Sequence, residues 1–323
     1  MAFAAAMLLA FVPAFSMAGF VYWLDRYEKE PLVVLGAAFF WGAVVAAGGA
    51  YIFNTVFGIG IYALTGSGDI ADQATTSLVA PFVEEALKGG ALLMIFMAFR
   101  SEFDSILDGI IYAGVTALGF AATENVQYIY EHGYVQNGWE GLLQLAFIRV
   151  LVVGWQHPFY TAFTGIGLGF ARLHKGLPVK LVALAAGYSF AVVAHAFHNS
   201  FGSIIGGLKG FALGSLIDWI GWFMMAVFIV FMIGRERGLL QRQLKDEVGG
   251  GILSAAQYER ALSPWTMTLA LVTGGPAAAS FYRLCGELAH KKEQLMRLGD
   301  ERGNVALITA LRSELSELGT KVR

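Results

Sequence analysis

The sequence of 323 residues lacks the features that mark soluble, secreted or nucleic-acid-binding proteins. Only 14% of its residues are charged, whereas an ordinary soluble domain carries about a quarter. A single cysteine, Cys285, excludes a disulfide within the chain. The net charge of −2 leaves no basic excess that would indicate nucleic acid as a partner. What the chain has instead is apolar sequence, which makes up 57% of its residues.

Apolar runs long enough to cross ~30 Å of hydrocarbon predict an all-α, polytopic transmembrane helix bundle of about seven spans. The first run has no basic segment before it, so we interpret it as a span and not as a signal peptide. The fifth run is long and is expected to bend at Pro158 or to tilt. The spans are expected at residues 2–24, 32–57, 75–98, 106–130, 141–172, 179–207 and 211–234.

Basic residues are unevenly distributed over the connecting segments. The loops after the second, fourth and sixth spans hold only Lys209. The other connections hold Arg26, Lys29, Arg100, Arg172, Lys175 and Lys180, and the seventh span is followed by Arg235, Arg237, Arg242 and Lys245. Lysine and arginine are retained on the cytoplasmic side, which predicts an outside N-terminus and a cytoplasmic C-terminus.

The composition changes near Arg235, which divides the chain into a membrane bundle (1–234) and a helical appendage (235–323). Apolar and charged residues alternate at helical spacing in the appendage, which predicts an αα-hairpin that turns near residues 299–303. The apolar piece TMTLALVTGGPAAA is too short and too interrupted by glycine and proline to span a bilayer. We expect the appendage to be cytoplasmic and available to a cytoplasmic protein partner.

Polar side chains inside the expected spans are few and clustered. They are Glu84, Glu85 and Lys88 on the third span, Glu124 and Asn125 on the fourth, Arg149, Gln156 and His157 on the fifth, His195, His198 and Asn199 on the sixth, and Asp218 on the seventh. Ionisable groups at such depth face the bundle interior and pair with one another. Counting ~1.5 Å per residue from the span ends puts four clusters in the middle to outer half of the bilayer, where they can meet in one cavity.

Spacing within the helices supports this convergence. Lys88 follows Glu84 by four residues and Glu85 by three, so its ammonium can reach either carboxylate. His195 and Asn199 lie four apart on one face. Structural interpretations stay open beside the functional one: the Glu–Lys cluster as a neutralised ion pair, Arg149 and Asp218 as structural groups, and His198 as a hydrogen-bonded core histidine.

Four motifs follow one another in order on consecutive expected spans. They are EEALK (84–88), the F-x-x-x-E of GFAATEN (119–125), HPFYTAFTGIGLG, which begins at His157, and HAFHN (195–199). Together with DRYEKEP (25–31), they resemble the PrsW family of intramembrane proteases, distant relatives of the CAAX prenyl endopeptidases. The resemblance covers residues 20–205 and leaves the appendage outside it.

The resemblance implies roles for these residues. Glu84 would be the general base, with Glu85 and Lys88 orienting and tuning it. Glu124 stands where relatives have histidine; His157 and His195 would bind a metal or polarise the scissile carbonyl, and Asn199 would stabilise the oxyanion. His198 occupies a position where an aromatic residue is expected.

Two histidines and one glutamate would supply the protein ligands of a catalytic zinc site, so His157, His195 and Glu124 are the expected metal ligands. The H-E-x-x-H motif is absent, and a metal-free glutamate mechanism stays open.

The leading hypothesis is an endopeptidase of a bacterial plasma membrane that cuts a membrane-anchored protein, such as a single-span anti-sigma factor. Two alternatives come from other classes. A proton-coupled transporter also uses intramembrane carboxylates and histidines, but predicts broken helices and repeats, and the sequence shows no repeat. A catalytically inactive scaffold acting through its tail predicts that Glu84 and His195 are dispensable.

Overall fold

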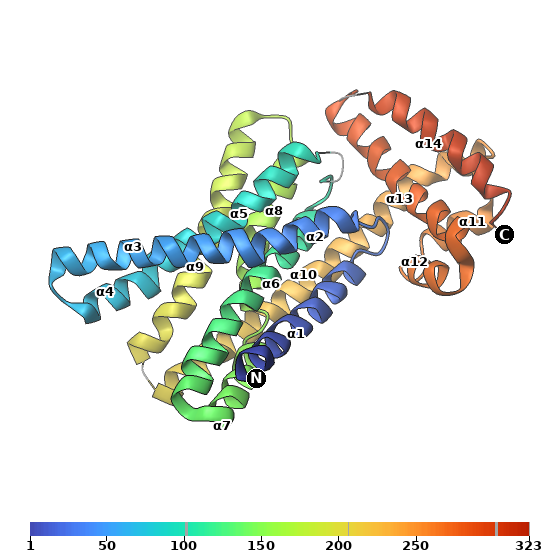
Figure 1. The fold of residues 1–323 in the computed structure, drawn as a ribbon. Coiled ribbons are helices and arrows are strands. Elements are labelled where there is room, and N and C mark those ends of the chain that lie inside the picture. The colour runs from blue at the N-terminus through green and yellow to red at the C-terminus, as the bar shows by residue number, and fades with distance from the viewer. Residues whose placement is uncertain (101–102, 206, 301–302, 323) are drawn as a thin grey trace.

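The computed structural model describes residues 1–100, 103–205, 207–300 and 303–322, and among them it contains helices and no strand (Figure 1). The helical segments, with η marking π-helix, are α1 (Ala2–Leu24), α2 (Leu32–Phe40), η1 (Trp41–Ala46), α3 (Ala47–Thr65), α4 (Gly68–Ala74), η2 (Thr75–Val79), α5 (Ala80–Ala98), α6 (Ile106–Gln127), η3 (Tyr128–Tyr134), α7 (Val135–Ala146), η4 (Phe147–Val152), α8 (Gln156–Arg172), α9 (Leu177–Ile205), α10 (Gly207–Gly249), α11 (Ala255–Ala261), α12 (Thr266–Leu269), η5 (Ala270–Gly274), α13 (Gly275–Leu298) and α14 (Asn304–Gly319). The expected all-α helix bundle is confirmed.

Five helical stretches of the described chain are long and apolar enough to cross a membrane. They are Ala2–Leu24, Leu32–Thr65, Ile106–Arg172, Leu177–Phe201 and Lys209–Gly249. The third of these contains α6 through α8, which reverse direction within it. The remaining expected span, α5, is not among them, because it carries three ionisable residues, Glu84, Glu85 and Lys88.

Helix α6 lies at the centre of the bundle, packed against α1, α2, η1 and α8. Glycines permit its closest approaches: a Cβ on Gly165 of α8 would lie 2.0 Å from the carbonyl oxygen of Gly109 on α6. Around this contact, α1, α2, α5 and α8 contribute Val21, Leu35, Leu92 and Leu168 to one apolar core with Leu107 and Leu118 of α6. The ends of these helices are thereby fixed relative to one another, and the polar residues that they carry are brought to similar depth.

The fifth expected span is two helices and not one bent helix. Residues 153–155 form a turn between η4 and α8, with φ and ψ of −122° and 12° at Val153. Pro158 lies in the first turn of α8, where proline needs no backbone donor and causes no kink. The chain therefore breaks before His157, at the depth of the other polar residues.

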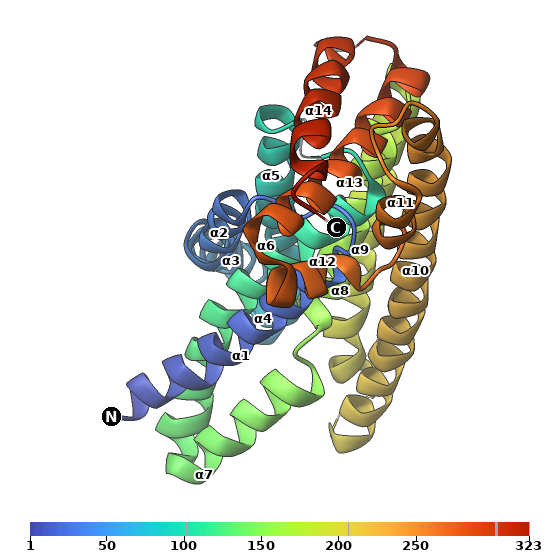
Figure 2. The same cartoon turned by 90° about the vertical axis from the view of Figure 1, so that its right-hand side faces the viewer.

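The expected domain boundary at 234/235 falls inside α10, which runs unbroken from Gly207 to Gly249. The second part of α10 joins α11, α13 and α14 around a separate apolar core of Leu240, Leu244, Leu253, Phe281, Leu288, Leu311 and Leu315. Figure 1 shows this appendage at one end of the bundle, and in Figure 2 that end is turned towards the viewer. We call that end the appendage side.

A buried ionic junction holds the appendage to the bundle. His290 Nδ1 of α13 lies 2.8 Å from Asp104 Oδ1, and Lys291 Nζ donates to Asp104 Oδ2 at 2.7 Å. Burial opposes charge on His290, but the carboxylates of Asp104 and Glu28 outweigh it and hold the pKa of His290 well above its usual value. Burial likewise opposes charge on Asp104, but Lys291 and His290 hold its pKa below the ordinary range.

The glycine contact between α6 and α8 leads to a first prediction. Gly165→Ala forces a methyl group against the Gly109 carbonyl and should destabilise the protein by about 1–3 kcal/mol. The matched control is Gly36→Ala on α2, where nothing lies within 4 Å of the added Cβ and alanine should be neutral or stabilising by up to about 1 kcal/mol. Thermal unfolding in detergent measures both; equal midpoints for the two variants would contradict the packing argument.

The junction leads to a pH prediction. A raised pKa of His290 contributes stability that is complete below its unfolded value of 6.5 and is lost as the pH rises through the folded value. The raised pKa of buried Glu28 acts in the same direction. The unfolding midpoint of the wild type should therefore fall between pH 6 and pH 9. His290→Gln should show a smaller fall, and His174→Gln, outside the junction, should behave as wild type. An undiminished fall in the His290 variant would show that the junction does not carry this dependence.

Candidate active site

A buried ion cluster joins α5 to α8 and α9. Lys88 Nζ donates to Glu85 Oε1 at 2.6 Å, and both side chains are fully buried. Thr161 Oγ1 donates to Glu85 Oε2 at 2.8 Å, and His195 Nδ1 lies 3.0 Å from Glu85 Oε1. A carboxylate only accepts hydrogen bonds, so Nδ1 of His195 carries the hydrogen, and in the neutral imidazole Nε2 keeps its lone pair. Glu85 therefore fixes the orientation and tautomer of His195.

Glu84, one residue earlier, has a different environment. Its Oε2 is buried and accepts no hydrogen bond from the described protein atoms. That oxygen lies 3.8 Å from His195 Nε2 and 3.9 Å from Lys88 Nζ. The other carboxylate oxygen, Oε1, is 3.5 Å from the side-chain nitrogen of Asn54 on α3. Glu84 is thus a buried carboxylate with an oxygen available to a ligand.

A second carboxylate–imidazole pair comes from α6 and the break before α8. His157 Nε2 lies 3.0 Å from Glu124 Oε2, and His157 Nδ1 lies 3.2 Å from Lys88 Nζ. Glu124 also forms an ion pair with Arg149, whose Nε donates to Asn125 Oδ1 at 2.6 Å. The guanidinium of Arg149 stacks on the ring of Tyr128. Because the chain turns at 153–155, the first turn of α8 can carry His157 towards both Lys88 and Glu124.

His198 belongs to a third group, on the side facing α10. Its Nδ1 lies 2.7 Å from Asp218 Oδ2, and Gln156 Nε2 donates to the same carboxylate oxygen at 2.7 Å. The hydroxyl of Tyr160 donates to Asp218 Oδ1 at 3.3 Å. Asn199 lies nearby and donates from Nδ2 to the carbonyl oxygen of Thr76 at 2.9 Å.

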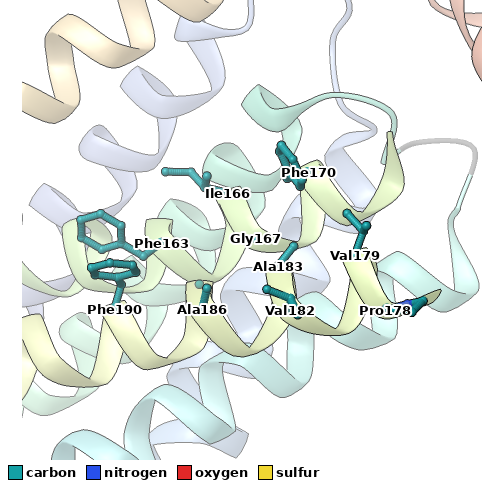
Figure 3. A pocket seen from close by; sticks show the side chains of 11 residues that line it. Phe163, Ile166, Gly167, Phe170, Pro178, Val179, Val182, Ala183, Ala186 and Phe190 are labelled. Carbon is teal, nitrogen blue, oxygen red and sulfur yellow. The ribbon is translucent and has the colours of Figure 1, made fainter. Parts of the chain in front are cut away.

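These groups surround one cavity of about 530 Å³. Of the residues selected from the sequence, Glu84, Glu124, His157, His195 and Asn199 line it, whereas Glu85 and Lys88 lie buried behind it. A hollow of about 470 Å³ between α8 and α9 differs from it, because its lining is entirely apolar (Figure 3). Only the first of these two has groups for acid–base chemistry.

One atom from each of Glu84, His157 and His195 lies within 4.8 Å of the other two, which makes this trio a candidate metal site. Two imidazoles and one carboxylate suit a catalytic zinc ion, and the unpartnered Glu84 oxygen fits a ligand role. Carboxylates hydrogen-bonded to the imidazoles, as Glu85 and Glu124 are, are the usual support for metal-bound histidines. The residues present therefore fit a metal.

Several residues at or beside the cavity have roles that little in the sequence indicates. Arg149 was expected to be structural, yet it holds Glu124 at the cavity wall. Its separation from Glu124 by 25 residues, across a chain reversal, gave no periodic signal. Asn54 and Tyr160, which line the cavity, and Thr161, which donates to Glu85 behind it, were not selected, because single amides and hydroxyls in apolar helices are common. The charge of Arg149 within an expected span was the one available indication.

Buried carboxylates and imidazoles surround a polar cavity on helices of membrane-crossing length. Such groups can supply the acid–base chemistry and the metal ligands that an intramembrane hydrolase needs. The comparisons with known proteins agree. The family model described as PrsW family intramembrane metalloprotease matches residues 30–234. Protease PrsW of Bacillus subtilis (strain 168) is 28% identical over 223 residues, which are 68% of this chain and 87% of the relative.

Two further relatives are also called Protease PrsW. That of Oceanobacillus iheyensis is 25% identical over 225 residues, covering 70% of this chain and 92% of the relative. That of Clostridioides difficile (strain 630) is 33% identical over 124 residues, covering 38% of this chain and 50% of the relative. No solved structure matches the chain.

The chain belongs to the PrsW family of intramembrane metalloproteases, as its motifs indicated. It is an integral membrane protease, and its substrate is a protein in the membrane. The break before α8 is a feature that the transporter hypothesis predicted, but family membership decides in favour of the protease.

The ion cluster leads to a third prediction. Glu85→Gln removes the carboxylate that is hydrogen-bonded to the Lys88 ammonium and should cost about 3–5 kcal/mol of stability, because the buried ammonium loses its closest counter-ion. Adding Lys88→Met should recover part of this loss. Glu131→Gln, a surface change on η3, should stay within about 0.5 kcal/mol of wild type. Unfolding midpoints of the four proteins test this, and a Glu85 variant as stable as wild type would refute it.

Proposed function

We propose that this chain hydrolyses a peptide bond of a membrane-anchored protein in the cavity lined by Glu84, His157 and His195, with Glu84 as general base. The observation that carries the proposal is the free, buried Glu84 Oε2, 3.8 Å from the free Nε2 of His195. A water between these two atoms would have two acceptors, one of which can take its proton. Glu84 then delivers that proton to the leaving amine.

The other side chains act by positioning. Glu85 holds the His195 ring through Nδ1, and Glu124 holds the His157 ring through Nε2. Lys88 compensates the charge of Glu85. Without a metal its ammonium also donates to His157 Nδ1, the ring nitrogen that would bind the metal in its place. The Asn199 amide has a second hydrogen besides the one given to Thr76, and this hydrogen would stabilise the oxyanion.

A divalent metal, zinc in our proposal, would polarise the scissile carbonyl as a Lewis acid. His157 and His195 would hold the metal. Either Glu124 or Glu84 would be its third protein ligand. Glu124 is the ligand that leaves Glu84 free as base, and its Oε2 is in contact with His157. The 4.8 Å trio favours Glu84 as ligand instead. The two assignments differ in which glutamine substitution releases the metal.

Helix geometry places the reaction away from the appendage side. Glu84, His157, His195 and Glu124 lie 14 to 18 residues from the helix ends at Ala98, Arg172, Leu177 and Ile106, which is roughly 21–27 Å along the helices. We propose that the appendage side is cytoplasmic, in line with its arginine and lysine residues. Cleavage would then occur in the outer half of a bacterial plasma membrane. A single-span regulator such as an anti-sigma factor presents a peptide bond at that depth.

The fourth prediction concerns the base and the metal. Glu84→Gln should lower cleavage of a co-reconstituted single-span anti-sigma factor by roughly 10²–10⁴-fold, the usual contribution of a general base. It should keep the metal content of the wild type, whereas His157→Ala and Glu124→Gln should lose the metal. Glu131→Gln, outside the cavity, is the control for both measurements. Elemental analysis after purification without chelators gives the metal content.

The outcomes separate the assignments. Metal lost from Glu84→Gln and kept in Glu124→Gln would make Glu84 the ligand. If the active wild type contained no metal, the metal-free glutamate mechanism would be the remaining explanation. Full cleavage by Glu84→Gln would refute the proposed base.

A further inference from the structure

The appendage contains one long stretch without charge. No aspartate, glutamate, lysine or arginine occurs from residue 261 to residue 282, between Arg260 and Arg283. This stretch forms the short helix α12, the turn η5 and the start of α13. It is far too interrupted to cross a bilayer, so its apolar character has another cause.

Large apolar side chains of this stretch lie on the molecular surface. Trp265 is 54% exposed, Leu269 58% and Val272 78%. A few hundred Å² of contiguous apolar surface on a soluble face marks a binding site for a protein or a membrane. The surface formed by Trp265, Leu269 and Val272 is called here the α12 surface.

The α12 surface lies where α1 leaves the membrane. The ring of Trp265 is 5.9 Å from that of Trp23, in the last turn of α1. The Arg26 guanidinium covers both rings, at 3.3 Å from Trp23 and 4.7 Å from Trp265. Both views place α12 beside this end of α1 (Figures 1 and 2), and Figure 1 shows α14 farther from the bundle.

Tryptophan and arginine side by side at the end of an apolar helix are typical of the membrane–water interface. We propose that the α12 surface is a membrane anchor, inserted among the headgroups and upper acyl chains of the lipid leaflet on the appendage side. Lipid is the occupant that we favour for two reasons. The α12 surface adjoins α1, which is long and apolar enough to cross a membrane. Residues 261–282 also contain no charged side chain. The anchor attaches the appendage directly to the bilayer, in addition to its attachment to the bundle at the Asp104 junction.

Site-specific labelling of the full chain in vesicles tests this proposal. Cys285 is the only cysteine and is fully buried, so a Cys285→Ala background leaves a single introduced thiol to react. Leu269→Cys reports on the α12 surface. Met296→Cys, on an exposed apolar residue near the end of α13, is the matched control at 74% exposure. Each is labelled with bimane and reconstituted in phosphatidylcholine–phosphatidylglycerol vesicles.

The lipid anchor predicts opposite quenching at the two positions. Nitroxide-labelled lipid should remove most of the fluorescence at position 269 and little at position 296, while aqueous iodide should do the reverse. Equal quenching by iodide at both positions would overturn the proposal. Protection of position 269 from both quenchers would also overturn it, because another protein surface would then cover the site.

Discussion

A charged carboxylate inside a lipid-spanning bundle is tolerated only where protein groups replace its hydration, and Glu85 meets this condition through Lys88, Thr161 and His195. Leaving such a charge unpaired costs several kcal/mol, so these contacts tie α5, α8 and α9 to one relative position. The active-site cavity is a consequence of that constraint. His195 cannot turn away from the cavity without leaving Glu85, and Lys88 cannot leave Glu85 without losing its hydrogen-bonded counter-ion.

The glycine contacts between α6 and α8 are a second constraint on the relative positions of the helices. Gly109 and Gly165 bring α6 and α8 into backbone contact, and this short distance allows Glu124 on one helix to reach His157 on the other. A wider separation would put a gap between the two side chains, which water or lipid would fill. Packing of small residues on the appendage side therefore determines the hydrogen bonding farther along the helices, by roughly 22 Å on α6 and roughly 12 Å on α8.

Much of the fold and site could be predicted from the sequence, because both depend on local rules. Apolar run length gave the helices, and residue counting placed Glu84, Glu124, His157 and His195 at similar depth, in one cavity. The break at 153–155 could not be predicted, since Pro158 reads as a kink unless the start of α8 is known. The pairing of Arg149 with Glu124 depends on a chain reversal at Gly138. The contact of His290 with Asp104, 186 residues away, leaves no mark on the spacing of either motif.

Adjacent carboxylates on one helix need not share an environment. Successive residues of an α-helix point about 100° apart, so Glu85 faces Thr161 of α8 and His195 of α9. It also accepts from Lys88 of its own helix. Glu84 faces the cavity and keeps one oxygen free. The pair thus separates two demands that one carboxylate could not meet: a saturated anion that fixes the helices, and an unsaturated one that can exchange a proton. Lys88, three and four residues on, is within 4 Å of both carboxylates, so a single cation compensates the first while staying close to the second.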